Sequence, residues 1–341
     1  MKRRPAILAV DAGGSKIDAA LLRRDGTLLG AARLRSTDHG GVGSADHLGL
    51  LVDALVPAVR DAGLDPSHRP IADLGVFCLA GADLPADDRR IEAWLRAQRL
   101  AGEELVRNDT FAVLRAGTDR AWGVGIVCGY GTNCAALAPD GRVMRFPAVG
   151  TISGDWGGGA DIGGEALWHA IRAEDGRGER TSLRELIPRH FGLKQPHHVV
   201  EAMHFGRLNE DRLVELAPLT FRAATGGDVV ARRIVDRQAD EIVTMAGTAI
   251  RRLRMRKLDV DVVLGGGIFR NRDEPFFERI RDGVRAIAPL ARIEVLSDPP
   301  VIGAALIGLD RLHAGRPAQR RIRAGLTDQR LGAHTHGRRK G

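Results

Sequence analysis

The chain has 341 residues, 44% hydrophobic and 4% aromatic, which is enough for two domains with sizeable cores. No run of 18 apolar residues and no charged-then-apolar leader is visible, so we expect a soluble, cytoplasmic protein without a membrane partner. The formal charge is +8, but residues 316–341 hold eight basic residues and one aspartate, which leaves the rest nearly neutral. We therefore expect no nucleic-acid partner, and a disordered basic tail over 316–341.

Three cysteines, Cys78, Cys128 and Cys134, lie in apolar, strand-like runs. None belongs to a CxxC pair or stands at metal-ligand spacing from a histidine. We interpret them as small core residues in a reducing compartment, because buried free cysteines behave as small hydrophobic side chains. A redox or metal-binding role is disfavoured.

The first predicted element is a buried strand over 7–10, followed by a glycine turn and a second strand over 17–22. The turn, residues 13–16, has two glycines that let backbone N–H groups approach a ligand, and a serine and a lysine suited to phosphate oxygens. Asp11, at the end of the strand, could hold Mg²⁺ directly or through water. An ordinary hairpin turn explains the same residues, and the spacing of a P-loop is missing.

Residues 27–35 predict a third strand, and Ser44 is a suitable N-cap for the helix that follows. A nearly continuous apolar strand comes next over 71–79, as expected inside a sheet that is covered on both faces. It ends in a turn at Gly81. Open α/β sheets bind ligands at the carboxyl ends of such strands, so this turn is a candidate contact.

A carboxylate stands where the next predicted strand, 104–107, passes into a helix over 111–116. Asp109 at this junction is a suitable N-cap, because aspartate is favoured at that position in any helix. A catalytic base could occupy the same place. The position alone favours the cap and leaves the second interpretation open.

The second half of the chain repeats the first hairpin at a shift of 116 residues. An apolar strand over 122–127 precedes the turn 129–133, and another strand follows. Two strand–glycine–strand hairpins with hydroxyl side chains at their tips indicate two similar halves. Glycine hairpins also recur in unrelated α/β proteins, so the repeat alone does not define a function.

Residues 150–165 form the most glycine-rich stretch and contain Asp155, Trp156, Asp161 and Glu165. Because such a run costs backbone entropy without a gain in packing, we interpret it as a loop that contacts a ligand rather than as a flexible connector. Helical patterns follow over most of the chain up to residue 256. Their histidines lack carboxylate or cysteine neighbours at ligand spacing, so we predict no metal site there.

A buried strand over 261–264 ends in three glycines at 265–267. Close backbone approach to a flat ligand, such as a nucleobase or a ribose, would explain three glycines, whereas a tight strand-to-helix turn needs only one or two. A helix over 274–288, a strand over 292–296 and a small-residue helix over 298–308 complete the predicted elements.

This ordered set of turns resembles the superfamily of sugar kinases, heat-shock ATPases and actin, and within it the BadF/BadG/BcrA/BcrD ATPase family, which includes N-acetylglucosamine kinases. The resemblance covers about residues 6–315. It implies an α/β fold with two actin-like ATPase (ribonuclease H-like) domains and a nucleotide cleft between them. The implied domains are 1–117 and 118–297, the second with a helical insertion, and a terminal helix over 298–315 that returns to the first domain.

The resemblance also implies where ATP, Mg²⁺ and a sugar bind. The ATP contacts are expected at Asp11, Gly13, Gly14, Ser15, Lys16, Tyr130, Gly131, Thr132, Gly265, Gly266 and Gly267. Asp11 is expected near Mg²⁺, and Asp109 matches the catalytic aspartate of the family. The sugar contacts are expected at Asp38, His39, Gly81, Asp109, Thr132, Asn133, Asp155, Trp156, Gly157 and Asp161.

Two positions and one segment depart from the family pattern. Asp38 replaces the asparagine of a Ser-Thr-Asn-His loop, and Tyr130 stands where a small hydroxyl residue is common. The Gly-Asp-Glu-Gly-Ser segment that the family has after its tryptophan is replaced by residues 161–165, Asp-Ile-Gly-Gly-Glu. The carboxylate that contacts the sugar is therefore displaced or replaced, by Asp155 or Asp161, and the identity of the sugar stays open.

The resemblance implies ATP-dependent phosphorylation of the 6-hydroxyl of N-acetylglucosamine or a related amino sugar, and we expect a homodimer. One alternative is an ATPase that drives electron transfer, as in activators of acyl-CoA dehydratases from the same family, but no cysteine here lies in a ligand-like loop. A second is a sugar or nucleotide sensor. A third is a kinase for a different acceptor, which the altered segment 161–165 leaves open.

Overall fold

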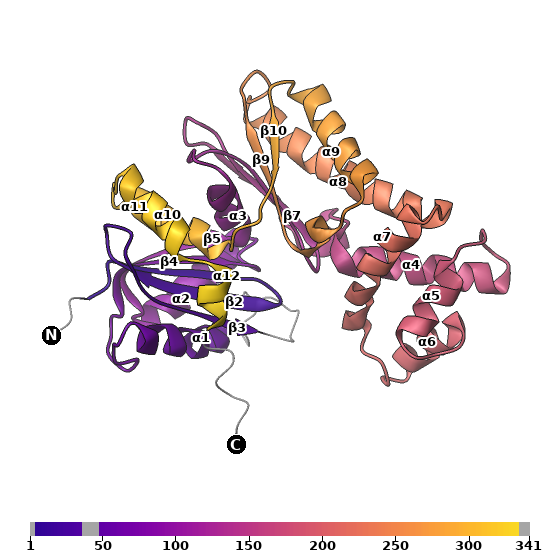
Figure 1. Ribbon diagram of the computed structural model, residues 1–341, viewed down its shortest axis with the longest axis horizontal. Helices are drawn as coiled ribbons and strands as arrows, with labels where there is room; N and C mark the ends of the chain where they lie inside the picture. The colour runs from indigo at the N-terminus through magenta and orange to yellow at the C-terminus, as the bar shows by residue number, and fades with distance from the viewer. Residues whose placement is uncertain (1–3, 36–47, 334–341) are drawn as a thin grey trace. The chain divides into compact units, whose positions relative to one another are not determined.

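The computed structural model describes residues 4–35 and 48–333, and these divide into two compact units (Figure 1). Unit 1 lies within Met1–Gly125, Ala135–Pro147 and Glu294–Gly341. Unit 2 comprises Ile126–Cys134 and Ala148–Ile293. The two units therefore interleave along the chain, which differs from the predicted boundary at residues 117 and 118.

Unit 1 contains a five-stranded sheet in the order β3–β2–β1–β4–β5. Its strands are β1 (Ile7–Ala12), β2 (Lys16–Leu22), β3 (Leu28–Arg35), β4 (Ala72–Leu79) and β5 (Ala101–Asn108). Strands β1, β4 and β5 run parallel, and β2 and β3 complete an antiparallel edge. The register pairs Asp11 with Cys78 and Leu79 with Asn108, so the carboxyl ends of the parallel strands share one edge.

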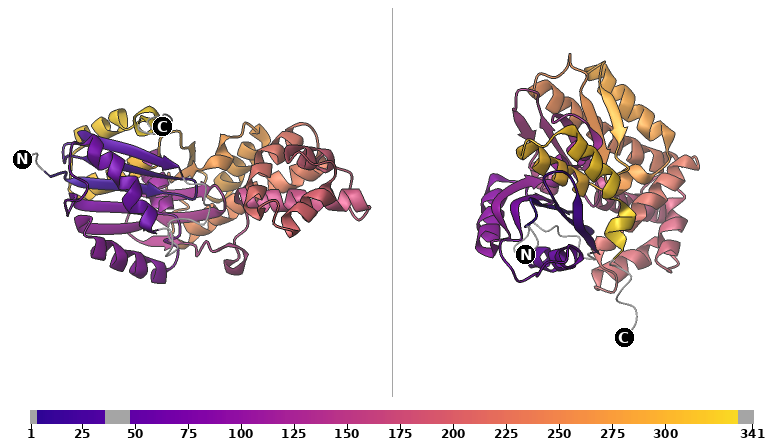
Figure 2. Two further views of the ribbon diagram at one scale, coloured as in Figure 1. Left: turned by 90° about the horizontal axis from the view of Figure 1, so that it is seen from below. Right: turned by 60° about the vertical axis from the view of Figure 1, so that its left-hand side comes forward.

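Helices cover both faces of this sheet because side chains alternate along each strand (Figure 2). Leu8 and Val10 of β1 belong to a core with α1 (Leu48–Asp61) and α2 (Pro85–Gln98). Ile7 belongs to the core on the opposite face. The helices of that face are α3 (Asp109–Gly117), α10 (Val301–Arg311), α11 (Arg316–Gly325) and α12 (Asp328–Gly332).

The basic segment after residue 315 is helical and packs on unit 1. Its buried apolar side chains are Ala318, Ile322, Leu326 and Leu331. The prediction of a disordered tail over 316–341 was therefore wrong for residues 316–333, because a sparse apolar pattern with four-residue spacing was outweighed by the surrounding arginines. Residues 334–341 lie outside the described part of the chain.

A second sheet has the order β10–β9–β6–β7–β8. Its strands are β6 (Gly123–Cys128), β7 (Thr132–Leu137), β8 (Val143–Arg145), β9 (Asp261–Gly265) and β10 (Arg292–Val295). Arg145 of β8 donates to both carboxylate oxygens of Asp88 on α2, at 3.1 and 2.5 Å. This forked ion pair joins β8 to α2, and both elements lie in unit 1.

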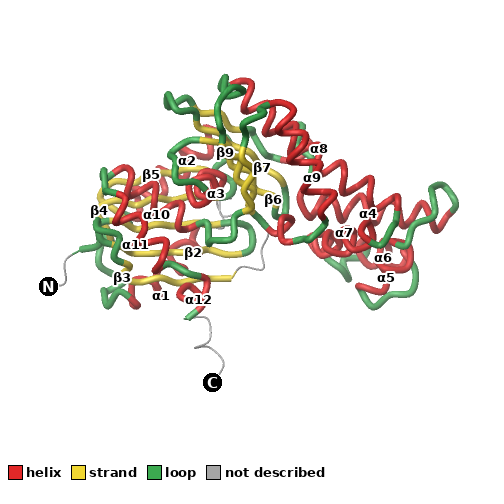
Figure 3. Tube along the Cα trace, turned by 45° about the horizontal axis from the view of Figure 1, so that its top comes forward, coloured by secondary structure: helices red, strands yellow, loops and turns green. Residues whose placement is uncertain are grey.

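Unit 2 is mostly helical (Figure 3). Its helices are α4 (Gly158–Asp175), α5 (Leu183–His190), α6 (Pro196–His204), α7 (Ala217–Thr225), α8 (Val229–Arg252) and α9 (Glu274–Ile287), with 3₁₀ turns over Gly150–Ser153, Glu210–Leu216 and Gly267–Arg270. Asp228 caps α8 by accepting from the N–H groups of Val230 and Ala231.

The glycine-rich stretch 150–165 is only partly a loop. Helix α4 begins at Gly158, eight residues before its predicted start at 166. Asp161 and Glu165 therefore stand on a helix, where four-residue spacing places them on the same face. The mixed α/β class predicted from the sequence is confirmed. Within residues 4–35 and 48–333, no helix is long and apolar enough to cross a membrane.

Candidate functional site

The candidate site of unit 1 lies at the carboxyl edge of its sheet, where the β1–β2 hairpin turns. The Gly13 N–H donates to the carbonyl of Lys16 at 3.0 Å and closes the turn. Ser15 is exposed at the tip. Gly81 follows β4 on the same edge and has a φ of +85°, the left-handed conformation that glycine adopts without strain.

Four glycines in the predicted nucleotide turns have no internal structural reason to be glycine. They are Gly13, Gly129, Gly131 and Gly267: each lacks a left-handed φ, and a Cβ built on it would meet no described atom within 4 Å. Gly158 is different, because a Cβ there would lie 2.5 Å from the backbone of Gly131. At the first four positions a ligand has room to approach the backbone, and the phosphate contact stays a prediction.

A buried charge network supports the first hairpin from below. Asp18 on β2 is fully buried and pairs with Asp11 across the strands. The guanidinium of Arg33 donates to both carboxylate oxygens of Asp18, at 2.5 and 2.7 Å, and also to Asp328 of α12 at 2.6 Å. Lys16 lies 3.4 Å from Asp18, so its ammonium is held by an internal carboxylate.

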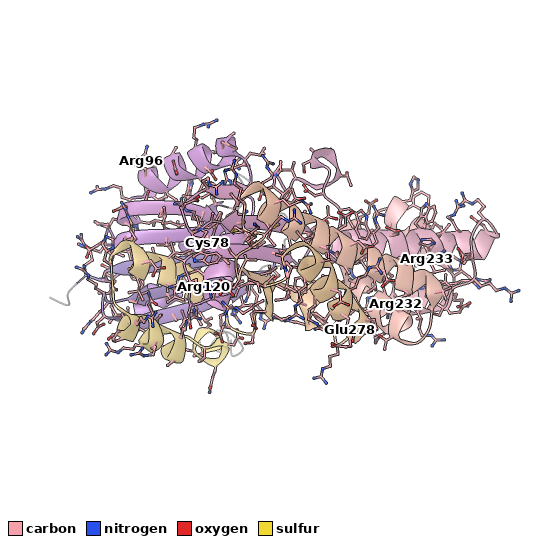
Figure 4. The ribbon with its side chains drawn as sticks, turned by 90° about the horizontal axis from the view of Figure 1, so that it is seen from above. Cys78, Arg96, Arg120, Arg232, Arg233 and Glu278 are labelled. Carbon is pink, nitrogen blue, oxygen red and sulfur yellow. The ribbon has the colours of Figure 1, made fainter. Side chains whose placement is uncertain are left out.

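The surroundings of Asp11 disfavour the ionised form of its carboxyl. Burial raises the pKa of its carboxyl well above the usual value, and the neighbouring Asp18 and Asp109 raise it further, while Lys16 and Arg33 act in the opposite direction. Cys78, the partner of Asp11 on β4, is buried within the sheet (Figure 4). A cation beside Asp11 would favour the ionised form of its carboxyl.

Asp109 does not cap its helix, although its sequence position favoured that role. The side chain of Asn108 caps the helix instead: it accepts from the Thr110 N–H at 3.0 Å and from the Thr110 hydroxyl at 2.6 Å. Asn108 is in turn held by Asp83, to which its amide donates at 2.8 Å. The N-cap interpretation of Asp109 is therefore wrong, and its carboxylate is left available at the sheet edge.

The environment of Asp109 raises the pKa of its carboxyl. Its side chain keeps some exposure, but the surrounding strand ends remove most of its solvent, which raises the pKa to about 6. Backbone N–H groups of Thr110 and of Asp109 itself, at the start of α3, act in the opposite direction. A carboxyl with this pKa exchanges a proton near neutral pH.

The candidate site of unit 2 is built on the second hairpin, between β6 and β7. Its tip is joined to the start of α4: the Gly159 N–H donates to the Gly129 carbonyl at 2.8 Å, and the Ala160 N–H to the Tyr130 carbonyl at 3.0 Å. Thr132 is buried, with its hydroxyl 3.4 Å from the Cys128 sulfur. Asn133 accepts from the following N–H at 2.7 Å.

Gln238 of α8 supports this hairpin and was missed in the sequence. Its side-chain oxygen accepts from the Gly158 N–H at 2.6 Å, and it is fully buried. A Cβ on Gly157 would lie 2.6 to 2.8 Å from the Gln238 amide and the Thr132 hydroxyl. The available signal was a polar side chain on the apolar face of a long amphipathic helix.

Tyr130 is placed differently from the expectation. Its hydroxyl donates to Asp211 at 3.0 Å, in the 3₁₀ turn that packs against α4. Burial and this carboxylate raise the pKa of the phenol. Only the backbone of Tyr130 thus remains at the hairpin tip for a contact with phosphate.

The two candidate carboxylates near Trp156 have different surroundings. Asp155 is buried and accepts a short hydrogen bond from the Ser153 hydroxyl. Asp161 is partly exposed, accepts from the Gly157 N–H at 2.7 Å, and lines a hollow of about 440 Å³ together with Trp156. Asp161 is therefore the one open to a ligand.

The glycines at 265–267 have separate causes. Gly266 has a φ of +110°, and a Cβ on it would collide with the backbone of Cys128, so the tight turn itself explains it. Gly267 faces open space, and Gly265 ends the buried strand β9. The turn accounts for Gly266, and the ligand contact stays a prediction for Gly265 and Gly267. The predicted sugar contacts Asp38 and His39 lie outside the described residues.

The structure thus gathers the predicted residues into one group on each unit. Unit 1 brings together Asp11, Gly13, Gly14, Ser15, Lys16, Gly81 and Asp109; unit 2 brings together the 129–133 hairpin, Trp156, Gly157 and Asp161. Two sheets that each carry a strand–glycine–strand hairpin define the actin-like ATPase fold, the class to which this α/β protein belongs.

Comparison with known proteins places the chain more narrowly. The model of the BadF/BadG/BcrA/BcrD ATPase family matches residues 8–308, and the chain belongs to this family. A curated relative, the N-acetylmuramic acid/N-acetylglucosamine kinase of Clostridium acetobutylicum, is 24% identical over 88% of this chain and 97% of its own. The N-acetyl-D-glucosamine kinase of Dictyostelium discoideum is 24% identical over 89% of this chain and 97% of its own.

A solved structure agrees with the fold. A protein from Chromobacterium violaceum, described as a candidate N-acetylglucosamine kinase, superposes with a TM-score of 0.67 at 23% identity. The match covers 89% of this chain and 99% of that protein. At this identity the likeness concerns the fold.

Proposed function

We propose that this chain is an ATP-dependent sugar kinase that phosphorylates the 6-hydroxyl of N-acetylglucosamine or a related amino sugar. Membership of the family and the names of two full-length relatives support a kinase of this class. The proposed mechanism depends on the position of Asp109. Because Asn108 already caps α3, Asp109 is a carboxylate at a sheet edge that the helix does not need for capping.

Asp109 acts as the general base in this proposal. With a pKa of about 6 it is mostly ionised at neutral pH, so it accepts the proton of the sugar hydroxyl as the oxygen attacks the terminal phosphorus of ATP. One oxygen–phosphorus bond forms, the bond to the bridging oxygen breaks, and ADP leaves. A base with a pKa near the working pH is the most efficient.

The glycine hairpins hold the phosphates. The space beside the backbone at Gly13, Gly129 and Gly131 lets a phosphate approach the hairpin tips, and the exposed hydroxyl of Ser15 supplies a donor. The proposal requires both hairpins to contact one ATP molecule. Gly267 is the candidate for close approach to the adenosine, while Lys16 acts through its ion pair with Asp18.

The residues of unit 1 fit a Mg²⁺ ion. Asp11 is a buried carboxyl whose pKa is raised first by burial and further by Asp18 and Asp109, so a cation beside it would favour its ionised, metal-binding form. Mg²⁺ characteristically uses one or two carboxylates and keeps waters and substrate phosphates as its other ligands, so the described residues need no cluster of three ligands, and they hold none. When bound, the ion would neutralise charge on the transferred phosphoryl group.

The sugar is held chiefly by residues of the second unit in this proposal. Asp161 replaces the displaced carboxylate of the family pattern, because it is the accessible one of the two candidates. Trp156, Gly157 and Asn133 are further candidate contacts, with Gly81 from unit 1. Asp38 and His39 complete the set by resemblance.

A coupled ADP-release assay over hexoses, amino sugars and N-acetyl amino sugars tests the function. We expect the highest kcat/KM with N-acetylglucosamine or a close relative, and the phosphate on the 6-oxygen when the product is examined by phosphorus NMR. Slow ATP hydrolysis that no sugar stimulates would contradict the kinase and favour an ATPase or a sensor. We further propose that the protein is a cytoplasmic homodimer. A measurement of its mass in solution tests the dimer.

A further inference from the structure

Two adjoining hollows follow one side of α4 in unit 2, the helix labelled in Figure 1. Their volumes are about 440 and about 270 Å³, and they share Gly164 and Trp168. We call the combined surface the α4 groove; the residues used below are Trp156, Asp161, Gly164, Glu165, Trp168 and Arg172. Only its end at Trp156 and Asp161 belongs to the site described above.

The floor of the α4 groove is a glycine that the fold does not require. Gly164 stands inside α4, where glycine is less favourable than alanine. It lacks a left-handed φ, and a Cβ on it would meet no atom of the described chain within 4 Å. The preceding Gly163 is different, because its Cβ would collide with the backbone of Leu213. Gly164 therefore keeps the groove open for something outside the fold.

Two indole rings flank this floor and are held in place. The guanidinium of Arg237 lies 3.9 Å from the ring centre of Trp156, and that of Arg172 lies 4.4 Å from the ring centre of Trp168. Trp168 is nevertheless 53% exposed. Each ring is thus restrained by a stacked cation, and Trp168 still presents apolar surface to solvent.

Carboxylates stand between the rings. Asp161 is bonded to the Gly157 N–H at 2.7 Å, and Glu165 pairs with Arg237 at 2.7 Å, which leaves further lone pairs on both groups. Burying these carboxylates under an apolar protein surface would cost their solvation, whereas hydroxyl and amide N–H donors would replace it. The combination of flat apolar rings with fixed acceptors suits a saccharide.

We propose that the α4 groove binds a second sugar ring attached to the phosphorylated one, so that the substrate class includes amino-sugar disaccharides. This inference rests on the proposed function, because it extends the sugar site at Trp156 and Asp161. Asp161 and Arg172 are separated by about 16 Å of helix, at the usual rise of an α-helix. A single ring occupies only part of that length, and a disaccharide uses both hollows.

Calorimetric affinity and kinase KM, for N-acetylglucosamine and for its β-linked disaccharide, test the proposal. We expect the disaccharide to bind more tightly than the monosaccharide. Gly164→Leu blocks the floor and Trp168→Ala removes one ring, so each weakens disaccharide binding by roughly threefold to tenfold and leaves the monosaccharide unchanged. Gly164→Leu should fold at least as stably as the parent, because leucine is the better helix former.

Ala173→Leu, on the same helix outside the groove, is the matched control and should change neither affinity. Unchanged disaccharide affinity in both groove variants would overturn the proposal, as would a parent protein that binds only the monosaccharide. Conversion of a dimer into a monomer by Trp168→Ala would assign the surface to a contact between copies instead. If no sugar is phosphorylated, the kinase function fails, while calorimetry still decides whether the groove binds the disaccharide.

Discussion

The two glycine hairpins have the same backbone pattern and different support. The hairpin of unit 1 is supported by charged groups. Asp11 and Asp18 are buried beneath it, and Arg33 donates a hydrogen bond to each carboxylate oxygen of Asp18. The hairpin of unit 2 rests on neutral groups, namely the buried amide of Gln238, the Thr132 hydroxyl and the start of α4. The difference indicates that buried ion pairs stabilise the first hairpin, whereas neutral hydrogen bonds and close packing stabilise the second.

Loss of the Arg33–Asp18 ion pair below the first hairpin should have the largest effect on the free energy of unfolding. Arg33→Met leaves Asp18 buried and paired only with Lys16, so we expect a loss of about 3–5 kcal/mol in the free energy of unfolding. The double variant Asp18→Asn/Arg33→Met removes both charges and should recover most of that loss. Urea denaturation measures both, and equal stabilities of the single and double variants would refute the electrostatic account.

Asp109→Asn tests the catalytic carboxylate of unit 1. We expect kcat to fall by about 100-fold, because the amide cannot accept the proton, with little change in ATP affinity. Steady-state kinetics and calorimetry with ATP measure the two quantities. Asp53→Asn, at an exposed position of α1, is the control and should leave both unchanged. Near-normal turnover of Asp109→Asn would remove the residue from this role.

A pair of glycine variants separates ligand contact from folding. Gly266→Ala forces alanine into a left-handed conformation and against the Cys128 backbone, so we expect a loss of about 1–3 kcal/mol in stability. Gly13→Ala meets open space and should fold within about 0.5 kcal/mol of the parent, yet raise the KM for ATP. Thermal unfolding and steady-state kinetics with ATP measure the two effects in Gly13→Ala. An unchanged KM for ATP would count against a phosphate contact at Gly13.

The neutral support of the second hairpin predicts a loss in the same range. Gln238→Met keeps the side-chain volume but removes the acceptor of the Gly158 N–H, which should cost about 1–3 kcal/mol in stability. Gln195→Met, an exposed glutamine of the same unit, is the matched control. Equal melting temperatures of the two variants would show that the hydrogen bond contributes nothing.

The pH dependence of kcat/KM should arise from Asp109 in unit 1. Below a pH of about 6 the carboxyl of Asp109 becomes protonated and can no longer accept a proton, so kcat/KM should fall by about tenfold for each further pH unit. Above that pH the rate should reach a plateau. The residual rate of Asp109→Asn should lack this acid limb; if the limb persists, another group causes it.

Much of the fold could be predicted because its signals are local. The apolar strand before Asp11, the glycine turn and the following strand are contiguous in sequence, and a repeat of the same pattern pointed to a second hairpin. The family resemblance rested on the order of such turns. The start of α4 was missed, because the glycines at 158, 159 and 163 resemble a loop until the close neighbours that require them are known.

Several site features could not be predicted because they depend on distant partners. Whether Asn108 or Asp109 caps α3 was decided by Asp83, which orients the asparagine. The role of Gln238 depends on which side of α8 faces the hairpin, 80 residues away in sequence from Gly158. The arginines of 316–333 looked like a solvated tail until Asp61 of α1 and Arg33 of β3 supplied their helices with partners.

The sequence by itself determined the strands, the three glycine turns, the family and the list of candidate residues, because each depends on short-range pattern. The tertiary structure alone decided which glycines are open and which are filled, which aspartate is accessible near Trp156, and which carboxylate is perturbed. Openness, solvation and pKa are properties of what surrounds a group, and the surroundings of Asp11 come from strands and helices far apart in the chain.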